Sequence, residues 1–247
     1  MTASEARRPG FRGGKLLLVG GGGFQMQSHP QIDLLLLAQT GRQRPKICFV
    51  PTASGDSEEA IERFYGRFRA LDCEPTHLAF FRKIGGASIP PARLAEAVPE
   101  QDVIFVGGGN TRSMLPVWKE WGLPEALAAS NSSGTLISGM SAGAICWFEW
   151  ALSDSVHGPG TITAIPGLGW LAGGCSAHFK PHNAAEVARA ANAAAVRGFL
   201  ALPDGVAAMF QQGQLTRLFA SHGSAGAVLW RDGHDVPIPP NVERCAI

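Results

Sequence analysis

Short apolar runs that end at glycine or proline alternate with amphipathic segments through the first two thirds of the chain. Each run is almost continuously apolar, which is typical of strands in a parallel sheet with helices on both faces. Ser57 before Glu58 and Glu59 predicts an N-cap and an acidic first turn for one intervening helix. The expected strands are residues 15–20, 46–51, 76–80, 102–106 and 135–139, and the expected helices are residues 31–39, 58–71, 111–121 and 124–129.

The pattern changes after Trp150. Residues 158–174 are rich in glycine and proline, and the alanine-rich residues 184–196 predict a helix. Four short apolar runs then predict mixed or antiparallel strands, at residues 199–202, 206–210, 215–220 and 227–230. Because crossovers between parallel strands are right-handed, the loops that follow those strands gather at one edge of the sheet, where we expect the site.

Composition and charge narrow the class of protein. With 45% hydrophobic and 17% charged residues, residues 15–247 are expected to form a single α/β domain after a flexible lead-in at residues 1–14. A net charge of +1 without a long basic run argues against a nucleic-acid partner. The apolar run at residues 16–19 is too short for a membrane span or a signal peptide, and five cysteines without a close pair favour a reducing, cytoplasmic location.

The segment Gly139-Met140-Ser141-Ala142-Gly143 places a serine between a predicted strand and a helix expected at residues 142–149. A nucleophile on such a sharp turn needs small neighbours, because strand and helix approach closely there. The same turn puts Ser141 at a helix N-terminus, where the Ala142 amide could stabilise an oxyanion. The alternative is an ordinary strand-to-helix turn in which Ser141 caps the helix.

A second glycine turn, Gly107-Gly108-Gly109-Asn110-Thr111, follows the strand expected at residues 102–106. Its backbone is a candidate second oxyanion donor, and Gly108, Asn110 and Thr111 are candidates for holding substrate. A phosphate-binding loop is the competing interpretation. It is disfavoured because the turn lacks a lysine, and neither this turn nor residues 20–23 completes the G-x-G-x-x-G pattern.

A serine nucleophile needs a general base and a carboxylate that orients it. The order of elements in hydrolases with an elbow favours a histidine from a later loop, and surface or capping roles stay open for each one. Asp204, at a Pro-Asp-Gly turn, and Asp154 are the two candidate acids, although such turns are also common on surfaces. The histidines that satisfy the order are His157, His178, His182 and His222.

Three stretches together resemble the peptidase E (aspartyl dipeptidase) family, which is related to cyanophycinase: 105–111, 139–144 and 202–205. The resemblance implies a three-layer α/β/α sandwich with a mostly parallel central sheet, akin to class I glutamine amidotransferases and flavodoxin-like. By position it implies Ser141 as nucleophile and His178 as catalytic base. It places Asp204, or alternatively Asp154, as the acid, and Gly109 and Ala142 at the oxyanion hole.

The activity implied by the resemblance is that of a serine peptidase, a dipeptidase or exopeptidase that hydrolyses short peptides through an acyl-enzyme, without metal or cofactor. A preference for an N-terminal Asp would need a cationic pocket, for which Lys180 and Arg189 are candidates. Residues 179–183 depart from the family pattern, so an esterase, a cyanophycinase-like enzyme and a non-catalytic α/β binding protein stay as alternatives. A homodimer also stays open, since an interface or core packing would explain Trp118, Trp121, Trp147 and Trp150.

Overall fold

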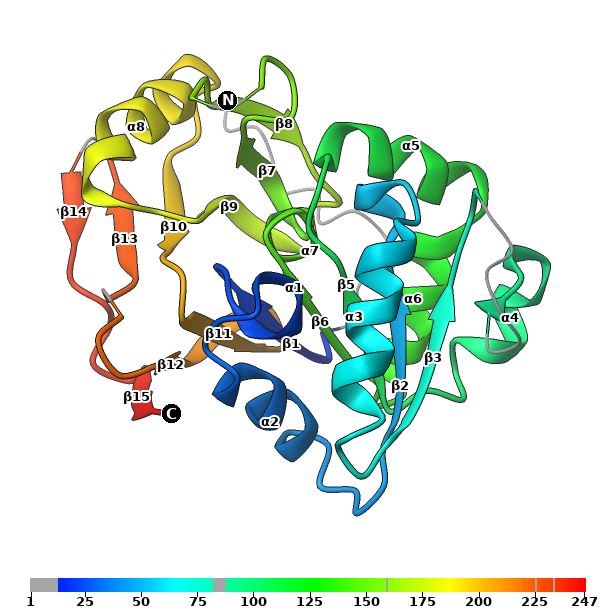
Figure 1. Cartoon of the computed structure of the whole chain (residues 1–247). Coiled ribbons are helices and arrows are strands. Elements are labelled where there is room, and N and C mark those ends of the chain that lie inside the picture. Colours follow the sequence, from blue (N-terminus) through cyan, green and yellow to red (C-terminus); the bar gives the residue numbers. More distant parts are fainter. Residues whose placement is uncertain (1–12, 82–87, 159, 225, 233) are drawn as a thin grey trace.

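A large, mostly parallel sheet is the centre of the molecule (Figure 1). The structure, a computed structural model, describes residues 13–81, 88–158, 160–224, 226–232 and 234–247, so most of the lead-in expected at residues 1–14 lies outside the described residues. In the described part the strand order is β15-β12-β11-β1-β6-β5-β2-β3-β4. The parallel strands are β1 (Lys15–Val19), β6 (Leu136–Met140), β5 (Val103–Val106), β2 (Lys46–Val50), β3 (Glu74–Leu78) and β4 (Ser88–Ile89).

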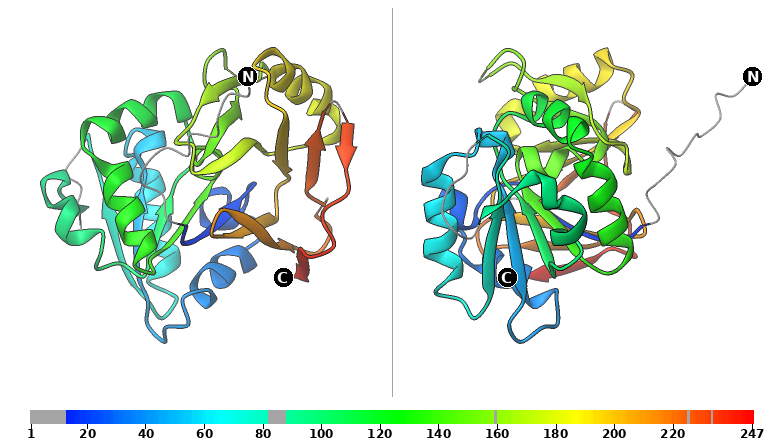
Figure 2. Two further views of the ribbon diagram at one scale, coloured as in Figure 1. Left: turned by 180° about the vertical axis from the view of Figure 1, so that it is seen from behind. Right: turned by 90° about the vertical axis from the view of Figure 1, so that its right-hand side faces the viewer.

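Helices cover both faces of this sheet, and Figure 2 shows the resulting three layers. Alternate residues of β1 face opposite layers, because successive side chains of a strand point to opposite sides. Leu16 and Leu18 pack in one core with the helices α4 to α6, whereas Leu17 and Val19 pack in another with α1 to α3. These helices are α1 (Gly23–Met26), α2 (Gln31–Ala38), α3 (Glu58–Phe68), α4 (Leu94–Ala97), α5 (Thr111–Glu120) and α6 (Leu123–Ser132), with the 3-10 turns η1 (Thr52–Ser54) and η2 (Pro91–Arg93).

The predicted α/β/α sandwich and its five parallel strands are therefore confirmed, with bounds that differ by one or two residues at most ends. The predicted N-cap is also present, since the Ser57 hydroxyl accepts from the Ala60 N–H at 3.4 Å. The antiparallel strands expected near the C-terminus are β11 (Val206–Gln211) and β12 (Gln214–Ala220), and β15 (Glu243–Ala246) pairs in parallel beside them.

A second sheet was not predicted from the sequence. Its order is β14-β13-β10-β9-β7-β8, and the helix α8 (Ala184–Ala193), which follows the 3-10 turn η3 (Pro181–Asn183), packs on it through Val187 and Ala191. One core contains residues from both sheets, among them Leu18 of β1 and Leu200 of β10. The strands are β7 (Phe148–Ser153), β8 (Thr163–Pro166), β9 (Leu171–Ala177), β10 (Gly198–Leu202), β13 (Val228–Arg231) and β14 (His234–Val236).

The prediction of a helix over residues 142–149 is wrong in its length. The helix α7 (Ala142–Ile145) is a single turn, and the chain then enters β7. The Trp147 indole N–H donates to the Gly143 carbonyl at 2.7 Å, which closes the turn with a side chain. Ala151 and Leu152, adjacent in the chain, are buried in two different cores, as successive residues of a strand are and as one face of an amphipathic helix does not allow.

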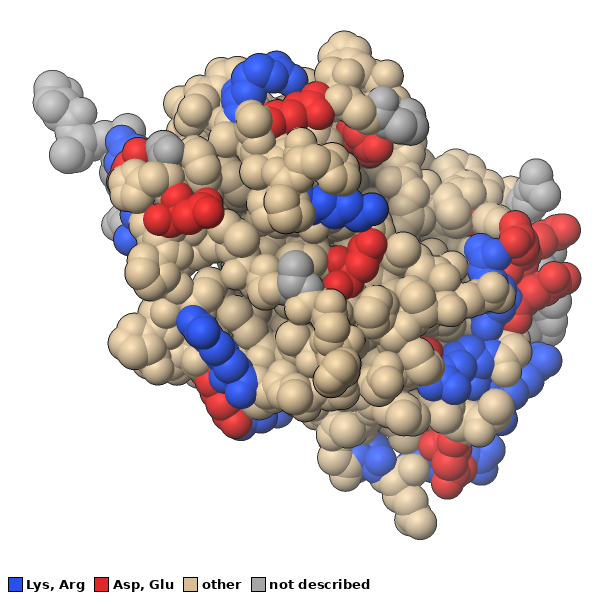
Figure 3. Space-filling model, turned by 60° about the vertical axis from the view of Figure 1, so that its left-hand side comes forward, with Lys and Arg blue, Asp and Glu red and all other residues tan. Residues whose placement is uncertain are grey.

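Surface features agree with the near-neutral charge. On the face drawn in Figure 3, Lys and Arg side chains form small groups that lie beside Asp and Glu side chains, rather than one broad basic patch.

None of the described helices is long and apolar enough to span a membrane. Trp118 and Trp147 are fully buried, Trp150 packs against a core and Trp121 is 48% exposed, so core packing accounts for three of the four tryptophans, and a homodimer stays a prediction.

Candidate active site

Ser141 lies at the turn between β6 and α7, in a backbone conformation that non-glycine residues rarely adopt. Its φ is 56° and its ψ is −115°. Residues held in such sparsely populated conformations cost about 1–3 kcal/mol each and cluster at functional sites. Ser141 occupies the N-cap position, yet its hydroxyl accepts no cap hydrogen bond. The capping alternative therefore does not account for this serine.

Two glycines make the turn possible. A Cβ on Gly139 would lie 2.3 Å from the Gly143 carbonyl oxygen, and a Cβ on Gly143 would lie 2.2 Å from the Val106 carbonyl oxygen. Both contacts are with backbone, which cannot move aside as a flexible side chain can. The small residues that flank Ser141 in the sequence are therefore required by the close approach of α7 to β5 and β6. This is the arrangement of a nucleophile elbow.

His178 and Asp204 form a hydrogen-bonded pair at the ends of β9 and β10. The His178 Nδ1 atom lies 2.6 Å from Asp204 Oδ1, and the two side chains are 39% and 28% exposed. β9 and β10 are neighbouring parallel strands, so residues that follow their C-terminal ends are brought together by the sheet itself. In this geometry the carboxylate holds Nδ1–H, which leaves Nε2 as the basic nitrogen.

The C-terminal end of β1 connects the two parts of the site. The Val19 carbonyl accepts from the Ser141 N–H at 3.2 Å, and the next carbonyl, that of Gly20, accepts from the His178 N–H at 3.1 Å. The described residues include no hydrogen bond between the Ser141 hydroxyl and the His178 ring. Catalytic hydrogen bonds are often long before substrate binds, so this geometry is compatible with a serine and a base brought together from the two sheets at the C-terminal end of β1.

Gly21 packs directly against the His178–Asp204 pair. A Cβ at this position would lie 1.9 Å from Asp204 Oδ1 and 2.8 Å from His178 Nδ1. The Gly21 carbonyl also accepts from the Gly205 N–H at 2.8 Å, which ties the glycine run of residues 20–23 to the turn that carries Asp204. This run, considered in the sequence only as a phosphate loop, thus makes room for the acid and the base.

The glycine turn after β5 lies against Ser141. A Cβ on Gly108 would be 3.1 Å from the Ser141 Cβ. The amides on either side of Gly109 have partners, because Gly108 N–H donates to Gln25 Oε1 at 2.9 Å and Asn110 N–H donates to the Ala53 carbonyl at 2.7 Å. Within the described part of the chain, the Gly109 N–H between them has no acceptor. The Ala142 N–H, in the first turn of α7, is likewise left without an intrahelical partner.

Asn110 and Thr111 stabilise the junction between the glycine turn and α5. The Asn110 side chain caps α5 by accepting from Ser113 N–H at 2.9 Å, and it donates to the Ser155 carbonyl at 3.1 Å. Thr111 is fully buried, and its N–H donates to the Ser155 hydroxyl at 3.0 Å. A direct contact of either side chain with substrate stays a prediction.

Of the other candidate residues, Asp154 is exposed just beyond β7, and its carbonyl accepts from Gly158 N–H at 2.8 Å. In the described structure the carboxylate that contacts His178 is that of Asp204. Lys180 and Arg189 are both exposed, and Arg189 contacts Glu186 Oε1 at 3.4 Å. These positions do not form a buried cationic pocket.

The buried thiols offer no rival nucleophile. Five free cysteines are present, as the odd count suggested, and four of them are buried. Burial raises the pKa of Cys146, five residues after Ser141, well above its usual range, and it raises the pKa of Cys48 to about 12. Since the thiolate is the reactive form, these groups are inert at neutral pH. The described residues contain no His, Cys, Asp and Glu cluster able to hold a metal ion.

Comparison with known proteins agrees with this geometry. The sequence profile described as Peptidase family S51 matches residues 16–218, which include strands of both sheets and every residue of the candidate site but not β13, β14 and β15. The chain belongs to peptidase family S51. It is therefore a serine-type peptidase, and the resemblance to the peptidase E family is confirmed.

Individual relatives of this S51 peptidase cover nearly its whole length. The uncharacterized peptidase YgaJ of Bacillus subtilis (strain 168) is 41% identical over 217 residues, which are 86% of this chain and 90% of that protein. A peptidase from an acI-B1 Actinobacterium superposes with a TM-score of 0.57 at 18% identity, covering 90% and 89% of the two chains. A putative peptidase E protein from Listeria monocytogenes EGD-e superposes with a TM-score of 0.59 at 14% identity, covering 89% and 98%. At these identities the two structures show the fold.

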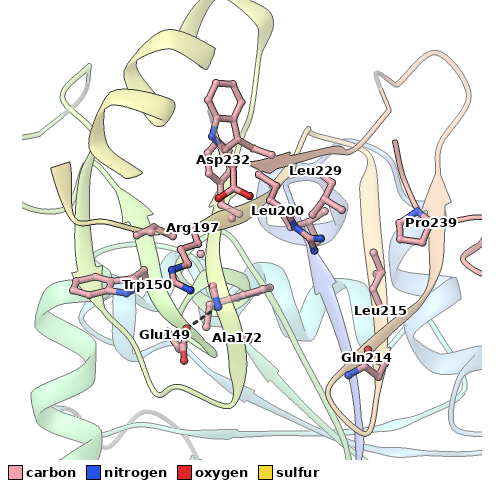
Figure 4. Close-up of a pocket in the computed structure, with 18 of the residues that line it drawn as sticks. Glu149, Trp150, Ala172, Arg197, Leu200, Gln214, Leu215, Leu229, Asp232 and Pro239 are labelled. Atoms are coloured by element: carbon pink, nitrogen blue, oxygen red, sulfur yellow. Dashed lines mark hydrogen bonds between the residues drawn. The ribbon is translucent and has the colours of Figure 1, made fainter. Parts of the chain in front are cut away.

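A cavity of about 880 Å³ lies elsewhere in the S51 peptidase (Figure 4). Its lining includes Arg197 directly before β10, Leu200 within β10, and Glu149 near the start of β7. The Glu149 carboxylate accepts from Gly173 N–H at 2.8 Å. Ser141, His178 and Asp204 follow the opposite, C-terminal ends of their strands and do not line it. We therefore place the chemistry at the C-terminal end of β1 and not in this cavity.

Proposed function

We propose that this S51 peptidase is an exopeptidase that hydrolyses short peptides through an acyl-enzyme on Ser141. The observation that carries the proposal is the uncapped, strained Ser141 and the hydrogen-bonded His178–Asp204 pair. The backbone amides of Ser141 and His178 bond to consecutive carbonyls, those of Val19 at the end of β1 and of Gly20 directly after it. A serine whose side chain makes no hydrogen bond within the described residues, a histidine with Nδ1 held by a carboxylate and a helix N-terminus are the components that acyl transfer requires.

In the proposed first half-reaction, His178 Nε2 accepts the Ser141 hydroxyl proton as Oγ bonds to the peptide carbonyl carbon. The carbonyl oxygen becomes an oxyanion that accepts from the Gly109 and Ala142 amides. The C–N bond then breaks, and the leaving amine takes the proton from His178. Asp204 keeps the imidazole oriented and stabilises its charged form throughout.

The second half-reaction releases the acyl group. Water attacks the ester carbonyl while His178 accepts its proton, and the C–O bond to Ser141 breaks as that proton returns to Oγ. No electron is transferred and the chain's own residues move every proton, so the proposal needs no cofactor. Removing one oxyanion donor typically costs roughly 2.7–4 kcal/mol of barrier, which makes the two backbone amides as important as the side chains.

The proposed substrates are short peptides with a free N-terminus, including peptides that begin with Asp. A panel of dipeptides and tripeptides with N-terminal Asp, Ala or Leu, each prepared free and N-acetylated, tests the proposal by mass spectrometry of the products. We expect hydrolysis of free peptides and none of the acetylated ones. Ser141→Ala should abolish cleavage, whereas Ser133→Ala, a matched change at an exposed position of α6's C-cap, should not. Cleavage that persists in Ser141→Ala would reject the mechanism.

A further inference from the structure

A glutamine outside the candidate triad touches the glycine turn beside Ser141. Gln25 lies in α1, and its Oε1 atom accepts from the Gly108 N–H at 2.9 Å across 83 residues of sequence. An N–H donor can be met only by the oxygen of the side-chain amide, so the orientation of this amide is fixed by its partner. The Nε2 atom lies on the other side, 3.2 Å from where a Cβ on Gly107 would stand.

α1 is held firmly although it is only one turn long. The Phe24 ring, next to Gln25, packs at centroid distances of 5.3–5.6 Å against an aromatic cluster from β2, α3 and β5. The Phe24 N–H donates to the buried Asp33 carboxylate at 3.1 Å, and Arg67 Nε donates to the same carboxylate at 2.8 Å. The cluster comprises Phe49, Phe64, Phe68 and Phe105.

This anchoring decides which amide of the turn is available. Gln25 engages the Gly108 N–H and Ala53 engages the Asn110 N–H, so within the described residues the Gly109 N–H is the member of the three that is left free. Gly109 has a φ of 141°, a conformation open mainly to glycine, and it needs support on both sides to persist. Gln25 supplies that support on the side nearest Ser141.

We propose that Gln25 is a positioning residue of the peptidase: by holding the Gly108 N–H, it fixes the turn so that the Gly109 N–H faces the oxyanion. The inference rests on the proposed function and deepens it. Gln25 acts through the backbone and not on the substrate, so its loss should slow the chemical step and leave the binding of a probe unchanged. An interaction made only in the transition state has that kinetic signature.

The test measures inactivation by a fluorophosphonate probe, in which the Ser141 Oγ–P bond forms, fluoride leaves and the proton passes to His178. Progress curves at several probe concentrations give kinact and KI separately. Gln25→Met removes the acceptor at nearly constant length, and Gln25→Ala removes it with a residue that favours the helix. Gln27→Met is the matched control, because Gln27 is exposed at the end of the same helix.

We expect kinact of both Gln25 variants to fall by at least about tenfold, and by up to the roughly 10²–10³-fold that loss of an oxyanion donor costs, with KI unchanged. Gln27→Met should match wild type. Equal kinact in Gln25→Met and Gln27→Met, with Ser141 labelled in both, would overturn the positioning role of Gln25 and leave the proposed function standing. A folded wild-type protein that is not labelled at Ser141 overturns the proposed function as well, so the two failures are distinguishable.

Discussion

Gly21→Ala separates His178 from Asp204 without replacing either of them. The added methyl carbon would stand 1.9 Å from Asp204 Oδ1, far inside van der Waals contact, and 2.8 Å from His178 Nδ1. Gly21 does not have a left-handed φ, so the alanine itself strains no backbone. The side chain of Asp204 is the part that can move, and it must move by about 1 Å or more, which breaks the 2.6 Å hydrogen bond.

The magnitude follows from the two effects that this displacement combines. A misplacement of about 1 Å costs roughly 10²-fold in rate, and loss of the carboxylate's hold on a catalytic histidine costs roughly 10⁴-fold in serine proteases. We therefore expect the turnover of a cleaved dipeptide to fall by between about 10² and 10⁴, equivalent to about 2.7–5.5 kcal/mol of barrier.

The control is Gly66→Ala, since Gly66 is exposed within α3 and a Cβ there meets nothing within 4 Å. It should keep full activity and gain about 0.5–1 kcal/mol of stability, as alanine favours a helix interior over glycine. Turnover and the thermal unfolding midpoint are measured for both variants. Wild-type turnover in a folded Gly21→Ala protein would refute the reasoning that the His178–Asp204 contact supports catalysis.

Three further predictions concern the acid, the glycine turn and a buried histidine. Asp204→Asn should lower turnover by roughly 10⁴-fold and Asp154→Asn far less; the reverse order would assign the role to Asp154. Gly109→Ala should lower the free energy of unfolding by at least about 1–3 kcal/mol, because its Cβ would lie 2.2 Å from the Ala53 carbonyl oxygen at a φ of 141°; an unchanged unfolding midpoint would contradict this. Burial lowers the pKa of His77. As the pH falls through about 6.5, the unfolded chain therefore binds a proton at this residue before the folded protein does. Stability should therefore fall as the pH drops below about 6.5, and by less in His77→Gln; equal pH dependence in denaturant titrations of the two proteins would oppose it.

The parallel strands and the helices around them could be predicted because each carries its own periodic signal. The run Leu16-Leu17-Leu18-Val19 is apolar throughout because its two faces enter two different cores. β9 gave no such signal. Its sequence contains two adjacent glycines and two alanines, and the strand is stabilised by pairing with β7 and β10 on either side, which is a tertiary effect.

The candidate site was predictable to the extent that its residues belong to local turns. The small residues around Ser141 and the glycines before Asn110 indicated close backbone approaches, and the structure contains them. Gln25 and Gly21 could not be assigned because their contacts join residues far apart in the sequence: Gln25 meets Gly108, and Gly21 meets Asp204. The only sequence signal was the glycine run of residues 20–23, which leads into α1 and marks a close approach without identifying the partner.

The central claim, that Ser141 is the nucleophile of this S51 peptidase, is tested most directly by locating the covalent adduct of a fluorophosphonate. The wild-type protein and Ser141→Ala are treated in parallel, digested, and mapped by tandem mass spectrometry. We predict one phosphonyl group on the wild-type chain, on the peptide that contains Ser141, and none on the variant. A folded wild-type chain without an adduct, or one labelled at another serine, would contradict the account.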